Sequence, residues 1–179
     1  MRGYAEQLGR QVHDGAQYAG SGCIMDELGK RIIAAFSAVK YPGDDKLTVY
    51  SRAGRAHDEV WAILKGKEWT QCPVTVLMRC DTPLADLTPA AFCYYMPAFL
   101  LACLDNGESG DIAHSLVYYL SAASYSDRAI FCLRLSEFNQ QQRDVMREVL
   151  YELIRRGVES EDDAHGALAA LDAGCAEKL

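Results

Sequence analysis

The sequence lacks the features that would place the chain in a membrane or on a nucleic acid. No uncharged run reaches the roughly 20 residues needed to cross a bilayer. Basic residues are too few for a phosphate-binding surface, because 18 Lys and Arg stand against 25 Asp and Glu, a formal net charge of −7. The N-terminal stretch has no apolar segment typical of a secretory signal. We therefore expect a cytoplasmic protein that binds neither membrane nor nucleic acid.

The sequence also lacks cysteine spacings typical of metal sites or disulfide frameworks. Its seven cysteines are an odd number, so they cannot all pair within one chain. No CxxC occurs and no cysteine lies within four residues of a histidine, whereas zinc sites usually contain such a close pair. Cys93 and Cys103 have apolar neighbours, among which a free thiol behaves as a small hydrophobic group. We expect reduced, structural cysteines and no metal or other cofactor.

Motifs that mark common active sites are absent. GxSxG, GxxxxGK[ST], HExxH and a GxGxxG that opens a helix do not occur. We therefore assign no catalytic residue. This absence lowers the odds of an enzyme without excluding one, because a site can be assembled from residues distant in sequence.

What the sequence does contain is helical periodicity. Apolar residues recur at helical spacing through 24–39 and 137–156, and half of all residues are hydrophobic. We predict a mainly α fold, a single compact helical domain of about six helices with at most two or three short strands. The domain covers 23–157. It follows a loosely attached arm, 1–22, and precedes an acidic, Ala-rich C-terminal helix within 158–179.

Local signals define several element ends. Thr88 is a favourable N-cap with Pro89 after it, and Pro97 should kink or split the helix that follows. Ser136 is the expected cap of the longest helix, and Gly157 suits its C-terminal end. Short strands are expected at 47–50, at 74–78, where an extended connection is the alternative, and at 129–135, where a helix is the alternative.

Three exposed groups are predicted to bind a protein partner. Asp44 and Asp45 follow a Pro-Gly turn. The second group is formed by the tyrosine doublets Tyr94/Tyr95 and Tyr118/Tyr119, in which helical geometry directs one tyrosine toward the core edge and the other outward. The third group is an acidic run near the C-terminus. The predicted contact residues are Asp44, Asp45, Tyr94, Tyr95, Glu159, Glu161, Asp162 and Asp163.

The alternative interpretation is a metal-assisted hydrolase. Asp44 and Asp45 could hold a divalent cation or act as acid and base, with His57 and Glu68 completing the site. The aspartates do not match an EF-hand loop, and turn capping is the commoner use of two aspartates after Pro-Gly.

Three segments together resemble a known family. They are Tyr41-Pro42-Gly43-Asp44-Asp45, Leu64-Lys65-Gly66-Lys67-Glu68-Trp69, and Leu87 to Leu100 with its sequence LTPAAFCYYMPAFL. Their order resembles that of a family of small bacterial proteins of uncharacterised function, over about residues 24–156. The chain is also similar in character to cytoplasmic immunity proteins, which neutralise toxins delivered between bacteria. The resemblance implies a bacterial, cytoplasmic binding protein and supplies no catalytic residues.

The predicted function is therefore protein binding. In its most concrete form, the chain is an immunity or inhibitor protein that masks a toxin, and an acidic inhibitor suits a basic toxin such as a nuclease. A purely structural or oligomerising module is a third hypothesis.

Overall fold

The structure, a computed structural model, describes residues 23–49, 55–79, 84–105, 110–121 and 128–173. These ranges contain eight α-helices and two 3₁₀ helices, and within them β-structure is limited to an isolated bridge between Thr48 and Leu87. The prediction of a single, mainly α domain is confirmed. The predicted arm, 1–22, lies outside the described residues.

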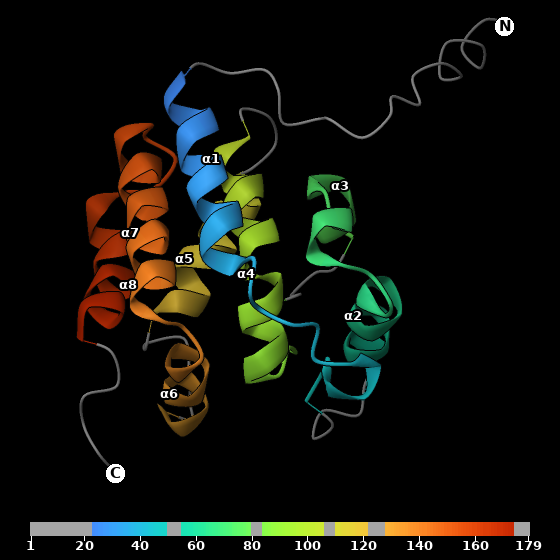
Figure 1. Cartoon of the computed structure of the whole chain (residues 1–179). Coiled ribbons are helices and arrows are strands. Elements are labelled where there is room, and N and C mark those ends of the chain that lie inside the picture. The colour runs from blue at the N-terminus through green and yellow to red at the C-terminus, as the bar shows by residue number, and fades with distance from the viewer. Residues whose placement is uncertain (1–22, 50–54, 80–83, 106–109, 122–127, 174–179) are drawn as a thin grey trace, which may run out of the picture.

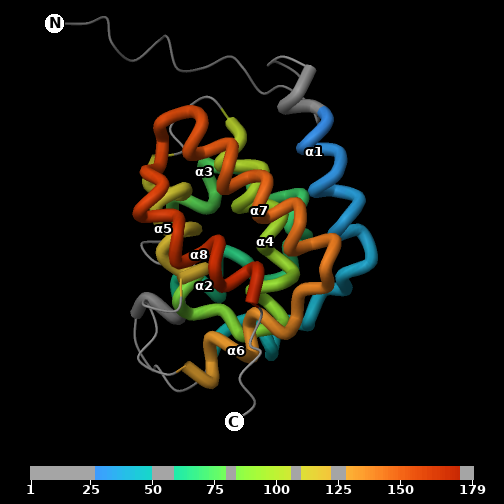
Figure 2. Tube along the Cα trace, turned by 90° about the vertical axis from the view of Figure 1, so that its left-hand side faces the viewer, coloured from blue at the N-terminus to red at the C-terminus, as the bar shows by residue number. Residues whose placement is uncertain are grey.

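The helices surround one central element. Figure 1 shows α7 and α8 on one side of α4 and α2 and α3 on the other, while Figure 2 looks onto α7 and α8. The order along the chain is α1 (Cys23–Phe36), η1 (Asp44–Lys46), α2 (Arg55–Leu64), η2 (Trp69–Gln71), α3 (Val74–Leu77), α4 (Pro89–Leu104), α5 (Gly110–Leu120), α6 (Arg128–Ser136), α7 (Gln140–Arg155) and α8 (Glu161–Ala173).

The central helix, α4, is buried on every side. All its residues from Ala91 to Leu104 are buried, and no side chain in it carries a charge. A helix that is apolar all round needs protein on all its faces, and α1, α3, α5, α6, α7 and η2 pack against it. Among the described helices, none is both long and apolar enough to cross a bilayer.

Pro97 lies within α4 without dividing it. Of the two outcomes predicted for this proline, a split helix is therefore wrong. Proline removes one N–H donor and crowds the preceding turn. Here the helices packed around α4 hold the chain on both sides of the proline, so burial outweighs the local penalty.

The predicted N-cap of α4 is confirmed, and the predicted N-cap of α7 is wrong. Thr88 caps α4, because its Oγ1 accepts a hydrogen bond from the Ala91 N–H at 3.2 Å. Ser136, the predicted cap of α7, is instead the last residue of α6. Asn139 is the cap, and it exchanges hydrogen bonds with Gln142 at 2.9 and 3.0 Å. This reciprocal pair is a capping box.

Gly157 ends α7 as predicted. Its φ is 68°, a left-handed conformation that glycine adopts without strain. The Gly157 N–H donates to the Ile154 carbonyl at 2.9 Å, and the Val158 N–H donates to the Leu153 carbonyl at 3.0 Å. These two bonds form a Schellman motif, which satisfies carbonyls at the end of the helix.

The predicted strand at 74–78 is wrong, and at 129–135 the helix given as the alternative is the correct one. Val74–Leu77 form α3, and Arg128–Ser136 form α6. Both short helices pack against α4, which decides their structure more strongly than the β-propensity of residues such as Val74 and Val76. In the described part of 47–50, only Thr48 makes a β-bridge.

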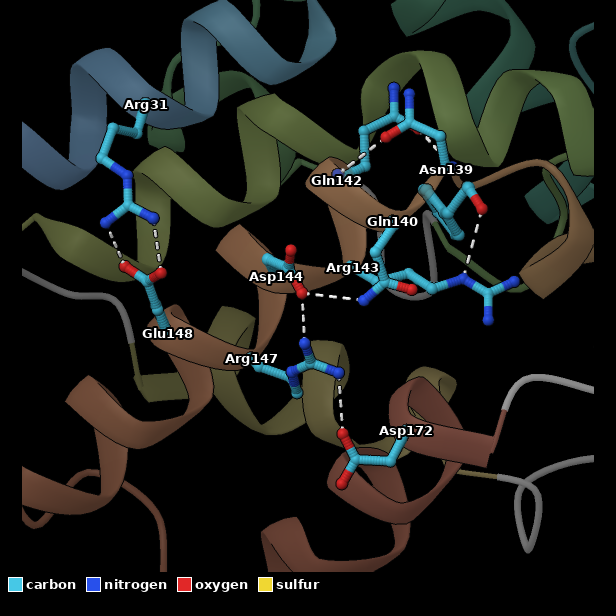
Figure 3. Close-up of polar contacts among 10 residues, drawn as sticks. Arg31, Asn139, Gln140, Gln142, Arg143, Asp144, Arg147, Glu148 and Asp172 are labelled. Carbon is cyan, nitrogen blue, oxygen red and sulfur yellow. Dashed lines mark hydrogen bonds and ion pairs between the residues drawn. The ribbon is translucent and has the colours of Figure 1, made fainter.

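Polar contacts join α1, α7 and α8 along their exposed edge (Figure 3). Arg31 and Glu148 form a two-bond ion pair between α1 and α7, with both N–O distances at 2.5 Å. Arg147 pairs with Asp144 on its own helix and with Asp172 of α8 at 2.7 Å. α8 also contributes to the core through Ala167 and Leu171, so it packs as an integral layer of the domain.

The cysteines only partly follow the expectation of reduced thiols. Cys72, Cys93 and Cys103 are buried thiols that are not part of a disulfide. Burial raises the pKa of the Cys93 thiol to about 12, with a further contribution from Glu137, so this group stays protonated and inert at neutral pH. Cys132 is disulfide-bonded, which corrects the expectation at that position.

Substitution of two adjacent isoleucines of α1 tests which face of this helix packs against the core. Ile32 is 0% exposed and Ile33 is 47% exposed. We expect Ile32→Ala to lower the free energy of unfolding by about 2–5 kcal/mol, because it leaves a cavity against α4. Ile33→Ala removes the same atoms at the surface and should cost less than about 1 kcal/mol. Urea denaturation of both variants measures the difference, and equal losses would contradict this placement of α1.

Candidate functional site

The three segments that carry the family resemblance meet beside the middle of α4, in a cluster that we call the motif junction. It contains Tyr41, Asp44, Gly66, Tyr94 and Tyr95. The Tyr41 hydroxyl donates to Asp44 Oδ1 at 2.5 Å. The Gly66 N–H donates to the same carboxylate oxygen at 3.0 Å and to the Tyr41 oxygen at 3.1 Å. One carboxylate therefore joins the first segment to the second.

The third segment enters the junction through its tyrosines. The Tyr95 hydroxyl lies 2.9 Å from the carbonyl oxygens of both Leu64 and Lys67, to which its single proton can be donated. The Tyr94 ring lies edge-on to Tyr41 and to Tyr95, with centroid distances of 5.3 and 5.0 Å. These contacts fix the chain after α2 against the middle of α4.

Both tyrosines of this doublet are buried, so the prediction that one of them points outward is wrong. The reason is that α4 is enclosed on all sides and has no outward face. The second doublet does follow the expected division, because Tyr118 is exposed and Tyr119 is half-buried. The predicted partner contacts at Tyr94 and Tyr95 thus fall on residues that hold the fold together.

Two glycines give the backbone of the junction its path. Gly43, before Asp44, has a φ of 98°, and a Cβ there would lie 2.9 Å from Asp45 Oδ1. Gly66 also has a positive φ of 66°. Both glycines occupy conformations that other residues rarely adopt. The Trp61 indole N–H donates to the Asp44 carbonyl at 2.9 Å, which ties α2 to η1.

The electrostatics of the junction favour an ionised Asp44. The hydrogen bond from Tyr41 lowers the pKa of Asp44, and the Gly66 N–H adds to the effect. Burial raises the pKa of Tyr41, as does its hydrogen bond to Asp44, so this phenol stays protonated as a donor. Asp44 is thus an acceptor within the fold, whereas its neighbour Asp45 is exposed.

The residues of the hydrolase hypothesis are only partly placed. Asp44 is hydrogen-bonded within the motif junction. The exposed Glu68 forms a capping box with Gln71 at the start of η2. The side chain of His57 lies outside the described part of the structure. Among the side chains that are described, no three of the types His, Cys, Asp and Glu are grouped so that they could hold a metal ion.

The acidic run lies at the other end of the molecule, where α7 turns into α8. Glu161, Asp162 and Asp163 are exposed in the first turn of α8. Ser160 caps this turn, since its Oγ accepts from the Asp163 N–H at 3.1 Å and donates to the Asp163 carboxylate at 2.5 Å. Glu159 differs from the other three because it is buried.

Sequence reasoning missed His114, the partner of Glu159. His114 Nδ1 lies 3.8 Å from Glu159 Oε1, across the junction of α5 with α8. Burial raises the pKa of Glu159, while the charge of His114 acts in the opposite direction. The two residues are 45 positions apart, and no motif or spacing connects them in the sequence.

The fold and the motif junction define a small, mainly α-helical domain in which a tyrosine–aspartate network joins three segments of the chain. A family of unknown function, DUF6714, matches residues 25–172, and the chain belongs to this family. Its range includes all three motif segments and most of α8, further toward the C-terminus than the resemblance reached. Comparison with curated proteins and with solved structures found no match.

Tyr95→Phe tests the motif junction. Removal of the buried hydroxyl leaves the carbonyls of Leu64 and Lys67 without this donor, so we expect the free energy of unfolding to fall by about 1–3 kcal/mol. The matched control is Tyr151→Phe on α7, where the side chain is 57% exposed and the change should be within about 0.5 kcal/mol. Chemical denaturation compares the two, and equal effects would speak against the network.

Asp44→Asn tests the charge at the junction. Because the pKa of Asp44 is lowered in the fold, the ionised carboxylate stabilises the protein above its ordinary value of 3.8, and this contribution is lost as the pH falls through the lowered value. The variant should therefore be less stable than the wild type at pH 7, with a difference that shrinks toward pH 3. Asp45→Asn, which removes the exposed neighbouring carboxylate, is the matched control. Urea denaturation of Asp44→Asn and the wild type from pH 3 to pH 7 measures the difference, and a difference that does not change with pH would contradict the prediction.

Proposed function

We propose that the chain is a protein-binding protein, and in its most concrete form a cytoplasmic immunity or inhibitor protein that masks a basic partner such as a toxin. The surface that we assign to this role is the acidic face, defined as Asp111 of α5 with Glu161, Asp162 and Asp163 of α8. All four side chains are exposed.

The observation that carries the proposal is a contrast between paired and unpaired carboxylates. All three acidic residues of α7 are paired with arginine: Asp144 with Arg147, Glu148 with Arg31, and Glu152 with Arg155. On the acidic face, by contrast, no Lys or Arg of the described residues lies within ion-pair distance. Neither α5 nor the stretch 157–173 contains a Lys or Arg.

The arrangement of α5 and α8 places these carboxylates at one end of the molecule. His114 of α5 faces Glu159, just before α8, and Ser121, just after α5, lies against Gly166 of α8. The two helices therefore run in the same direction, with their N-termini together. Helix dipoles stabilise acidic residues at such ends, so the charges are tolerated there without a cation from the same chain.

A basic protein surface is the complement of this face. Lys and Arg of a partner could form ion pairs with the exposed carboxylates. The opposite electrostatic potentials of the two surfaces would raise the association rate and disfavour partners of like charge. The overall charge of −7 extends the attraction beyond the face itself. A toxin is the class of basic partner that an immunity protein would bind.

Removal of charge from the acidic face tests the proposal. The variant Glu161→Gln/Asp162→Asn lacks two exposed carboxylates of α8, and the matched variant Glu27→Gln/Glu137→Gln lacks two exposed carboxylates elsewhere. The purified product of the neighbouring gene serves as the partner in surface-binding kinetics at low and moderate salt. We expect the first variant to slow association by about tenfold and the second by less than about twofold.

Two results would count against the proposal. One is failure of the wild-type chain to retain this partner at moderate salt. The other is equal slowing by the two variants, which would indicate a general charge effect in place of a defined face. Circular dichroism and unfolding midpoints confirm that both variants are folded, since removal of acidic residues from the first turn of α8 also weakens the helix slightly.

A further inference from the structure

Tyr118 places an exposed aromatic ring on the α5 side of the acidic face. It is 50% exposed, and its ring packs edge-on against that of Tyr119, with the centroids 5.0 Å apart. Asp111 and His114 precede it by seven and four residues, and both are exposed. Residues at these spacings share one face of a helix. The outward side of α5 is therefore a stripe that begins with a carboxylate and ends with a phenol ring.

The helix α8 packs alongside α5 (Figure 2). The contacts that His114 and Ser121 make with the segment 159–166 each join positions 45 apart in the sequence. The register of the two helices is thus constant, which puts Tyr118 level with the exposed Asp163. An aromatic ring and the carboxylates of the acidic face consequently belong to one surface, formed jointly by α5 and α8.

The segments that build this surface contain no strong cation of their own. No Lys or Arg occurs in 105–127 or in 157–177. The exposed imidazoles of His114 and His165 are the basic side chains that α5 and α8 contribute. Charge complementarity therefore favours a partner that brings its own Lys or Arg to the surface.

Tyr151 of α7 is a matched tyrosine in the opposite electrostatic setting. It is 57% exposed, close to the value for Tyr118. Arg147 and Arg155 lie one turn before and one turn after it, and each forms an ion pair with a carboxylate of α7. A cation that approaches Tyr151 meets like charges, whereas a cation that approaches Tyr118 meets the carboxylates of the acidic face.

We infer that Tyr118 is the anchor of the acidic face and that this surface receives an arginine side chain of the partner. The guanidinium stacks on the exposed ring and forms an ion pair with a carboxylate beside it. Arginine suits both contacts, because its planar group stacks on aromatic rings and binds carboxylates through two hydrogen bonds. A tyrosine among polar groups is also typical of the residues that dominate binding energy in protein interfaces. The inference rests on the proposed function and adds the chemistry of the contact.

Two end-blocked peptides of equal charge, hexa-arginine and hexa-lysine, probe this surface without the natural partner. Isothermal titration calorimetry at neutral pH and low salt measures their affinities. We expect Tyr118→Leu to weaken hexa-arginine binding about two- to fivefold, the size of a cation–π contact at an exposed site, and to weaken hexa-lysine binding less. Tyr118→Phe keeps the ring and should retain the wild-type affinity for both peptides.

Tyr151→Leu is the matched control, because it removes a similarly exposed ring and should leave both affinities unchanged. Circular dichroism confirms that each variant is folded. The inference is wrong if Tyr118→Leu binds hexa-arginine as tightly as the wild type does, or if Tyr118→Phe loses as much affinity as Tyr118→Leu. It is equally wrong if the two leucine variants lose the same affinity.

Two further measurements on the wild type locate the site and identify a different occupant. In NMR titrations, hexa-arginine should first shift the amide resonances of 111–118 and 161–165, and shifts confined to other helices would contradict the assignment. Sedimentation of the chain alone at increasing concentration tests for a second copy. A dimer that forms in the wild type and is lost in Tyr118→Leu would assign the surface to self-association and overturn the inference.

The peptide result and the partner result fail separately. Arginine binding that depends on Tyr118, together with no retention of the neighbouring gene product, would keep the arginine site and reject the proposed function. Partner association that is slowed by Glu161→Gln/Asp162→Asn but is insensitive to Tyr118→Leu would keep the proposed function and reject Tyr118 as its anchor.

Discussion

Burial of α4 on every side is the constraint on which the rest of the structure depends. Its run from Ala91 to Leu104 has no charged side chain, so each face must be covered by another element. The surrounding helices are short or amphipathic and pack their apolar sides against it. The ends of α4 are held by polar groups, with Thr88 at its start and Arg156 on its last carbonyls. This one helix thus organises both the layers of the domain and its hydrogen bonding.

Helix type and core were predictable from the sequence where the apolar spacing was regular. α1 and α7 followed from their periodicity, and Thr88 and Gly157 were recognised because caps have a chemical signature. The failures were at elements whose structure is decided by tertiary contacts. Val74–Leu77 is a helix that packs on α4, and Asn139 rather than Ser136 begins α7 because Gln142 completes the capping box. For 129–135 the sequence did not decide between strand and helix, and the segment is helical where it packs on α4.

The candidate site was predictable only in part, for a related reason. The exposed carboxylates of α8 were visible as an acidic run, since exposure of such residues is the norm. The burial of Tyr94 and Tyr95 was missed because helical periodicity assumes that every helix has an outer face. The pairing of Glu159 with His114 requires the crossing of α5 and α8, which no spacing in the sequence encodes.

The residues of the motif junction are used for packing within this chain. Its glycines, tyrosines and aspartate brace the backbone between η1, α2 and α4, and most of their polar atoms are engaged within the protein. The residues of these sequence motifs therefore have a structural role in this chain. The outward sides of α5 and α8 contribute no residue to the motif junction, so substitutions there can change what this surface contacts without disturbing the hydrogen bonds between η1, α2 and α4.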